Sequence, residues 1–79
     1  MKVRLLLFGS ARRLVGTAEL SLDAGPGARV ADLLADARLG PLAGHAGHLR
    51  FAVNEEFAAA ERSLAEGDTV AVLPPASGG

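Results

Sequence analysis

The sequence predicts one α+β domain, a mixed sheet of four or five strands with one main helix packed on one of its faces. Two periodicities predict it. Several short segments alternate between apolar and polar residues as half-buried strands do, and one segment repeats every 3.6 residues as an amphipathic helix does. The 79 residues allow one domain with one small core. One helix cannot cover both faces of such a sheet, so the other face is expected to stay open.

The first two strands are expected at residues 1–9 and 17–23, where the alternation is clearest. Between them, residues 10–15 could form a short helical turn that Gly16 would end. The apolar residues expected to point inward from the two strands are Val3, Leu5, Leu7, Ala18, Leu20 and Leu22. The opposite side of the second strand is polar, as in a strand with one face in water.

The main helix is expected over residues 29–38. Its apolar stripe follows the spacing i, i+3, i+4, i+7 and consists of Val30, Leu33, Leu34 and Ala37. Gly40 and Pro41 come directly after it and are expected to end it. Residues 39–49 contain three glycines and one proline, so they are expected to form a loop that could include one helical turn.

Two further strands are expected at residues 50–54 and 69–73. Their inward residues are Phe51, Val53, Val70 and Val72. Residues 57–60 are ambiguous and could pair weakly, and residues 66–68 form a tight turn before the last strand. This order of hairpin, crossover helix, short strands and final strand, with one face covered, is the β-grasp roll of ubiquitin.

The composition excludes several classes of function. A net charge of −1 without a basic stripe interleaved with aromatic residues argues against nucleic acid as a partner. The lack of cysteine excludes disulfides, thiolate nucleophiles and cysteine-ligated metals. There is no signal-peptide pattern and no apolar stretch of bilayer length, so we expect a cytoplasmic protein without a membrane partner. No paired acid and base, nucleophile triad or phosphate loop is present, so the chain is not expected to be catalytic alone.

Two pairs of polar residues are weaker candidates for a site. His45 and His48 could share a metal ion if their segment were helical. No third ligand lies nearby in the sequence, so we expect a solvated loop and no bound metal or cofactor. Arg12 and Arg13 could bind a phosphate or a partner's carboxylate, or simply form a solvated turn.

The C-terminal end is the strongest candidate for chemistry. We expect a folded domain over residues 1–75 and a flexible tail over residues 76–79. Pro74 and Pro75 favour a stiff, extended stalk that directs the tail away from the domain. The four tail residues reach about 13–14 Å when extended.

The tail ends in Ser77, Gly78 and Gly79, and Gly79 presents a free carboxylate. Glycines lack side chains, so they can thread a channel too narrow for other residues. A carboxylate is a poor acyl donor until a partner uses ATP to adenylate it, and a sulfur donor can then convert it into a thiocarboxylate. The alternative is an inert end or a cloning scar, because two terminal glycines occur by chance in about one chain in 200.

The alternation also predicts an apolar patch on the open face of the sheet. Leu6 and Phe8 fall on the outer side of the first strand and Leu73 on the outer side of the last, and Phe57 could join them. Exposed apolar residues at the root of a reactive tail are a candidate docking site for a partner. The alternative is that Phe8 and Phe57 fill a small satellite core or lie under the loop 39–49.

Four segments make the sequence similar, over essentially its whole length, to the small, sulfur-carrying subunit of molybdopterin synthase. They are Leu7 to Gly16, Ala52-Val53-Asn54, Glu66-Gly67-Asp68, and above all Val72-Leu73-Pro74-Pro75-Ala76-Ser77-Gly78-Gly79. Sulfur carriers of the thiamine pathway share the Gly-Gly end and the fold, but they typically lack the two prolines before it.

The resemblance implies a ubiquitin-like sulfur carrier. An enzyme similar to ubiquitin activators would adenylate Gly79, which would then be thiocarboxylated. The tail would enter the active site of a large subunit and donate sulfur to a cyclic pyranopterin precursor. Two carriers on a large-subunit dimer would form a heterotetramer and supply both dithiolene sulfurs of molybdopterin.

Positions matching the docking surface of this family are Phe8, Phe57 and Leu73. The chain departs from its relatives at Arg13, where an acidic residue is common, and at Ala76, where a β-branched residue is common. Three other functions remain compatible with the sequence. They are a sulfur carrier for thiamine or tRNA thiolation, a ubiquitin-like protein modifier, and a β-grasp interaction module with an inert tail.

Overall fold

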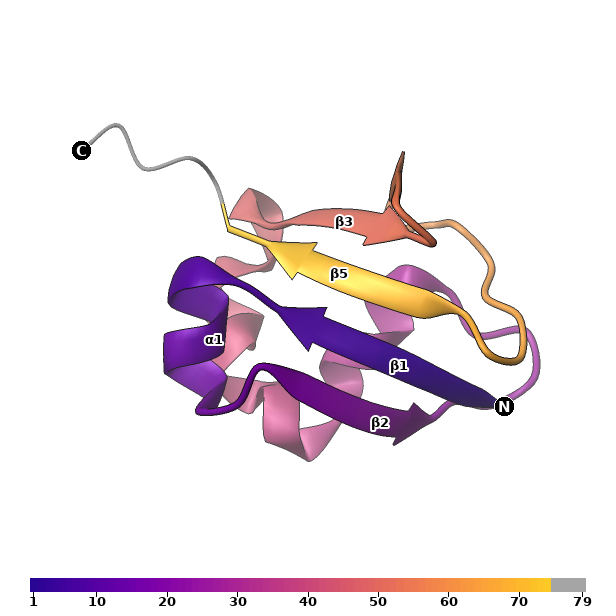
Figure 1. Cartoon of the computed structure of the whole chain (residues 1–79), viewed down its shortest axis with the longest axis horizontal. Coiled ribbons are helices and arrows are strands. Elements are labelled where there is room, and N and C mark those ends of the chain that lie inside the picture. Colours follow the sequence, from indigo (N-terminus) through magenta and orange to yellow (C-terminus); the bar gives the residue numbers. More distant parts are fainter. Residues whose placement is uncertain (75–79) are drawn as a thin grey trace.

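The computed structural model describes residues 1–74, except for the side chain of Ala46. The strands are β1 (Lys2–Leu7), β2 (Glu19–Asp23), β3 (Arg50–Val53), β4 (Glu56–Ala58) and β5 (Thr69–Leu73), and the helices are α1 (Gly9–Val15) and two 3₁₀ helices, η1 (Val30–Ala35) and η2 (Ala37–His48). The strands form one sheet in the order β2-β1-β5-β3-β4, and the helices lie together on one side of it (Figure 1).

The adjacent strands β1 and β5 determine the type of sheet. β1 and β5 are parallel neighbours, whereas β1 pairs antiparallel with β2, β3 with β5, and β3 with β4. A parallel pair needs a long crossover connection, and here the η helices form part of it. The sheet is therefore mixed and five-stranded, which confirms the predicted β-grasp arrangement.

The core lies between the sheet and the helices. It consists of Val3, Leu5, Leu7, Leu22, Phe51, Val53, Val70 and Val72 from the sheet, and of Ala11, Val30, Leu33, Leu39, Leu42 and Leu64 from the segments that cover it. One predicted inward residue differs, because Ala18 is exposed, whereas Leu20 is half-buried and packs against this core. Ala18 precedes β2, where its carbonyl accepts the Leu7 N–H at 2.8 Å, and β2 is an edge strand.

The predicted main helix over residues 29–38 is wrong in type and in its end. It is the 3₁₀ helix η1, and it stops at Asp36, whose backbone is extended (φ −63°, ψ 133°). The Asp36 carboxylate accepts the backbone N–H of Arg38 at 2.9 Å. Ser, Asp and Asn compete with helical hydrogen bonding in this way. Val30 and Leu33 of the expected stripe are buried, but Ala37 is exposed.

The predicted loop over residues 39–49 is also wrong, because most of it belongs to η2. Gly40 and Pro41 do not end a helix, and Pro41 lies inside η2. Leu39 and Leu42 are fully buried, and burying two leucines contributes about 1.5–3 kcal/mol each. That gain offsets the hydrogen bond which a proline cannot donate.

The short elements agree with the alternation. α1 covers the predicted helical turn, and Gly16 ends it in the left-handed conformation (φ 90°), with its N–H bonded to the Arg12 carbonyl at 2.8 Å. The ambiguous segment supplies β4, which pairs with β3. Asn54 and Glu55 both have positive φ angles (50° and 72°), as a tight two-residue hairpin turn requires.

A network of hydrogen bonds between Asn54 and residues 65–69 holds the start of β5. The Asp68 carboxylate accepts the Asn54 side-chain amide at 3.0 Å and the Ala65 N–H at 2.8 Å. The Asn54 side-chain oxygen in turn accepts the Thr69 N–H at 3.0 Å. The hydrogen bond from Asn54 and then that from Ala65 lower the pKa of Asp68 below its ordinary value.

Stability is therefore expected to fall in acid partly through Asp68. A carboxyl with a lowered folded pKa stabilises the fold above its unfolded pKa, about 3.9, and loses that contribution as the pH falls through the folded pKa. The urea midpoint, followed by far-UV circular dichroism, should drop between about pH 5 and pH 2, and Asp68→Asn should make that drop smaller. Equal drops in both chains would contradict the assignment.

Among residues 1–74, no helix combines the length and apolar character needed to cross a membrane.

Candidate functional site

The face of the sheet opposite the helices carries a continuous apolar row. Strand register pairs Leu6 with Ala71, Ala71 with Ala52, and Ala52 with Phe57. Paired residues on neighbouring strands point to the same side, so the row crosses four strands from β1 to β4. Phe57 is 77 % exposed and the other three are half-buried. No element among the described residues covers this open face.

Phe8 and Leu73 extend the row toward the root of the tail. The backbone of Phe8 is extended (φ −123°, ψ 156°), so the pleat of β1 continues through it and its side chain points to the same side as Leu6. Its N–H donates to the Val72 carbonyl at 3.3 Å, which places it beside the end of β5. Leu73 is half-buried, with Arg50 as its partner on β3.

We call Leu6, Phe8, Phe57 and Leu73 the apolar patch. The structure brings all four to the open face and leaves Phe8 46 % exposed, so neither phenylalanine fills a satellite core or lies under residues 39–49. Sequence reasoning did not include Ala52 and Ala71, the small residues that join Phe57 to Leu6. The sequence does indicate their outward position, because Ala52 and Ala71 alternate with the inward residues of β3 and β5.

The other half of the open face is polar. Arg4 is paired with Glu19 through bonds of 2.6 Å and 3.1 Å. The hydrogen bond from Arg4 lowers the pKa of Glu19, and the same bond raises the pKa of Arg4. Both side chains are more than half exposed, so the pair contributes little to stability. It marks the border of the apolar row, because Glu19 is the register partner of Leu6.

The apolar half lies where β1 and β5 end, which is also where the chain continues toward its C-terminus. Pro74 follows β5 directly and is half-buried. The predicted site residues Pro75, Ser77, Gly78 and Gly79 lie outside the described residues. The boundary between a domain over residues 1–75 and a tail over residues 76–79 stays a prediction for the same reason.

The two weaker candidate pairs also lie near the tail root. A small pocket of about 250 Å³ between α1 and η2 has Pro74 in its wall together with Leu14, Leu42, His45 and His48. We call it the tail-root pocket. Both histidines belong to η2 and are exposed, so the predicted loop is incorrect for them. Within residues 1–74, no group of three or more His, Cys, Asp or Glu residues is placed to hold a metal ion.

Arg12 and Arg13 are exposed in the last turn of α1. Basic residues at a helix C-terminus interact favourably with its dipole, which is a sufficient local reason for their position. This local reason does not test the predicted contact of Arg12 or Arg13 with a partner, which stays a prediction.

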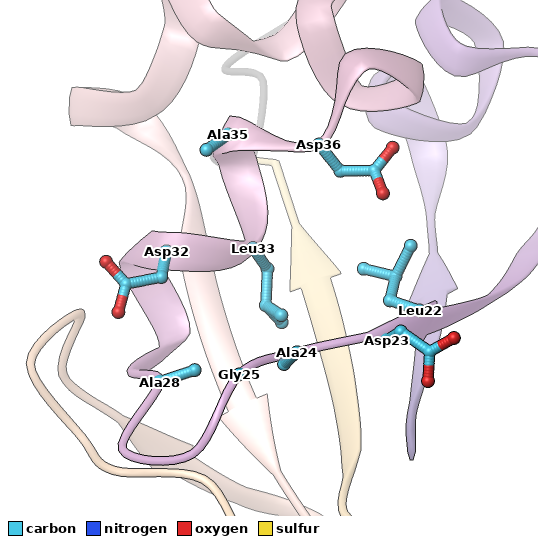
Figure 2. Close-up of a pocket in the computed structure, with 9 residues that line it drawn as sticks. All are labelled: Leu22, Asp23, Ala24, Gly25, Ala28, Asp32, Leu33, Ala35 and Asp36. Carbon is cyan, nitrogen blue, oxygen red and sulfur yellow. The ribbon is translucent and has the colours of Figure 1, made fainter. Parts of the chain in front are cut away.

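A second pocket, of about 270 Å³, lies between the end of β2 and η1 and carries three aspartates (Figure 2). Each carboxylate already has a partner. Asp23 accepts the Lys2 ammonium at 3.1 Å, Asp32 accepts the Arg29 N–H at 2.8 Å, and Asp36 accepts the Arg38 backbone and guanidinium. The side-chain bond from Arg38 lowers the pKa of Asp36. Asp32 and Asp36 therefore stabilise local turns, and Asp23 pairs with Lys2 across β1 and β2.

Comparisons with known proteins agree with this geometry. The family model described as the ThiS family matches residues 5–79. A molybdopterin synthase sulfur carrier subunit from Chlamydomonas reinhardtii is 33 % identical over 87 aligned positions, with full coverage of both chains. SAMP1 from Haloferax volcanii has a similar structure, with a TM-score of 0.88, 26 % identity and full coverage of both chains. A putative molybdopterin converting factor subunit 1 from Pyrococcus furiosus has a TM-score of 0.83 at 28 % identity, covering 96 % of this chain and 99 % of that one.

Proposed function

Because this chain belongs to the ThiS family of sulfur carriers, we propose that it is the small subunit of a molybdopterin synthase. In this role Gly79 is adenylated, thiocarboxylated and then used to donate sulfur to a cyclic pyranopterin precursor. The observation that carries the proposal is the apolar patch, which lies on the open face where β5 leads into the tail. The match to a molybdopterin synthase sulfur carrier subunit along the full chain supports the choice of pathway.

The proposed chemistry divides between this chain and its partners. The Gly79 carboxylate attacks the α-phosphate of ATP on an activating enzyme, and pyrophosphate leaves. A sulfide equivalent then displaces AMP at the acyl carbon and forms the thiocarboxylate. The chain supplies the carried atom and the docking surface, while its partners supply the catalytic groups, so it is not an enzyme alone.

Two partners follow from this division. One is an adenylyltransferase related to ubiquitin activators, which uses the ATP. The other is the large subunit, with two carriers on a large-subunit dimer in a heterotetramer. The Pyrococcus furiosus relative is named as subunit 1 of a molybdopterin converting factor, and that name supports a second subunit. The cytoplasm, expected from the sequence, is the proposed location of both complexes.

Protein modification is a second candidate function. It is favoured by the similarity to SAMP1, a protein whose name describes a small archaeal modifier. A modifier would use the same Gly79 adenylate but would end in an isopeptide bond to a lysine. Sulfur transfer in the thiamine pathway or to tRNA would share the thiocarboxylate and differ only in the final acceptor.

Intact-mass analysis tests the proposal. The chain is incubated with ATP, a sulfide donor and an adenylating enzyme purified from the same host. We expect a product in which one oxygen has been replaced by one sulfur, and recovery of a stable large subunit when the chain is purified from host cells. An unchanged terminus under these conditions would contradict the carrier function. Lysine-linked adducts in place of a large subunit would favour the modifier.

A further inference from the structure

We infer that Gly9 is a positioning residue for the sulfur-carrier reaction, because its missing side chain lets the Pro74 ring settle against it at the root of the tail. The inference rests on the proposed function, since it assigns to Gly9 a part in presenting Gly79. It concerns a residue at the start of α1, on the opposite end of the sequence from the tail.

The strand register brings Gly9 and Pro74 together. β1 and β5 run parallel with a constant offset, from Arg4 beside Thr69 to Leu7 beside Val72. The same offset carried past the strand ends places Gly9 beside Pro74. The parallel ladder closes with the bond from the Phe8 N–H to the Val72 carbonyl, and Pro74 has no N–H to extend it.

Two properties of residue 9 favour glycine. Its φ angle is +53°, a left-handed conformation that L side chains rarely adopt. A Cβ added there would lie 3.0 Å from Pro74 Cγ and 3.7 Å from Pro74 Cδ. Carbon atoms prefer separations of about 3.5–4.0 Å, so the ring would have to move away.

The contact with Pro74 is specific to Gly9 among the positive-φ glycines. Gly16, Gly27 and Gly67 also have positive φ angles, of 90°, 80° and 83°. A Cβ added at any of those three would meet no described atom within 4 Å beyond its chain neighbours. All four glycines therefore share a positive φ angle that disfavours a side chain. Of these four, only Gly9 also has a neighbouring residue, Pro74, that an added Cβ would crowd.

The position of Pro74 determines where the chain leaves the domain. Its ring lies against Gly9 and also forms part of the wall of the tail-root pocket, which residues of α1 and η2 line. Proline fixes its own φ near −65°, and a residue that precedes proline, as Pro74 does, is restricted to extended ψ values. The seating of the Pro74 ring therefore constrains the direction in which the chain leaves the domain. A methyl group at residue 9 would displace the Pro74 ring by a few tenths of an ångström and so redirect the chain that follows it.

The test compares Gly9→Ala with Gly27→Ala as adenylation substrates. Both variants carry the left-handed strain, so each should lower the folding equilibrium constant about 5- to 30-fold. Only Gly9→Ala should misdirect the tail, so its kcat should fall about tenfold with KM within about twofold. The probe is the host's adenylating enzyme with ATP, assayed by pyrophosphate release. Equal kcat values for the two variants would overturn the inference.

A double-mutant cycle keeps the inference testable if Gly9→Ala folds poorly. Pro74→Ala removes the ring, should lower kcat by a similar factor and leaves residue 9 unstrained. Combining it with Gly9→Ala should lower kcat no further, because both changes remove one contact. A double variant in which the two losses of kcat multiply would overturn the inference. If the unaltered chain is not adenylated at all, the proposed function fails. In that case an NMR cross-peak between the Gly9 Hα and Pro74 ring protons still reports the contact, and its absence would overturn the inference.

Discussion

A chain that lacks Gly79 is expected to fold normally and to lose adenylation by more than about a hundredfold. Removing one residue withdraws the carboxylate by about 3.3–3.6 Å, and a misplacement of about 1 Å at a reacting centre can cost about a hundredfold. Every strand, helix and core residue described above lies within residues 1–74. The melting temperature should therefore stay unchanged, while the carboxylate is no longer in place for adenylation.

The control for this deletion is Glu61→Gln, a change at an exposed residue outside the tail and the apolar patch. It keeps the length of the tail and the glycine carboxylate, so its rate of pyrophosphate release should stay close to that of the unaltered chain. Thermal unfolding followed by far-UV circular dichroism is the stability readout, because the chain has no tryptophan or tyrosine for fluorescence. Full adenylation after deletion of Gly79 would refute the carrier mechanism.

Replacing Phe57 by alanine is expected to weaken binding to the large subunit about 30-fold. A buried aromatic anchor at an interface contributes about 2 kcal/mol or more, which corresponds to about 30-fold in Kd. Because Phe57 is 77 % exposed in the free chain, its loss should change the free energy of unfolding by only about 0.5 kcal/mol. Isothermal titration of the purified large subunit with each carrier measures the Kd.

Glu61→Ala provides the control for Phe57→Ala. Glu61 is also exposed, but it belongs neither to the apolar patch nor to the tail-root pocket. Its replacement should leave the Kd within about twofold. Equal losses of affinity in the two variants would show that the open face is not the docking surface.

The strands were predictable because their signal is local and strong. Val70 and Val72 alternate with half-buried neighbours on β5, and the same alternation in the sequence predicts that Leu6 and Leu73 point outward. A one-residue slip would exchange the two faces of a strand. For this reason the pattern predicts the core and the open face together.

The segment from Asp36 to His48 was mispredicted because it follows a different period. Leu39, Leu42, His45 and His48 are spaced by three, which is the repeat of a 3₁₀ helix. The glycines and Pro41 in between favour a loop, and they interrupt the 3.6-residue apolar stripe of the preceding segment. The spacing of three was the signal that could have identified η2.

The contact between Gly9 and Pro74 could not be predicted from local sequence. It depends on which strands are neighbours and on the offset between β1 and β5, and both are decided by packing of the whole sheet. Phe57 was only a partial prediction for a similar reason. Its place on the open face follows from its pairing with Ala52 across the β3–β4 hairpin.

The central position of β5 also has a mechanical consequence. A tail held in a partner's channel transmits any pulling force to β5, which is hydrogen-bonded to β1 on one side and to β3 on the other. A force along the strand loads both ladders in shear, so many bonds must break together. An edge strand such as β4 has a single ladder to hold it. If the tail acts as proposed, this sheet order lets a carrier of 79 residues be withdrawn from successive enzymes without unfolding from its C-terminal end.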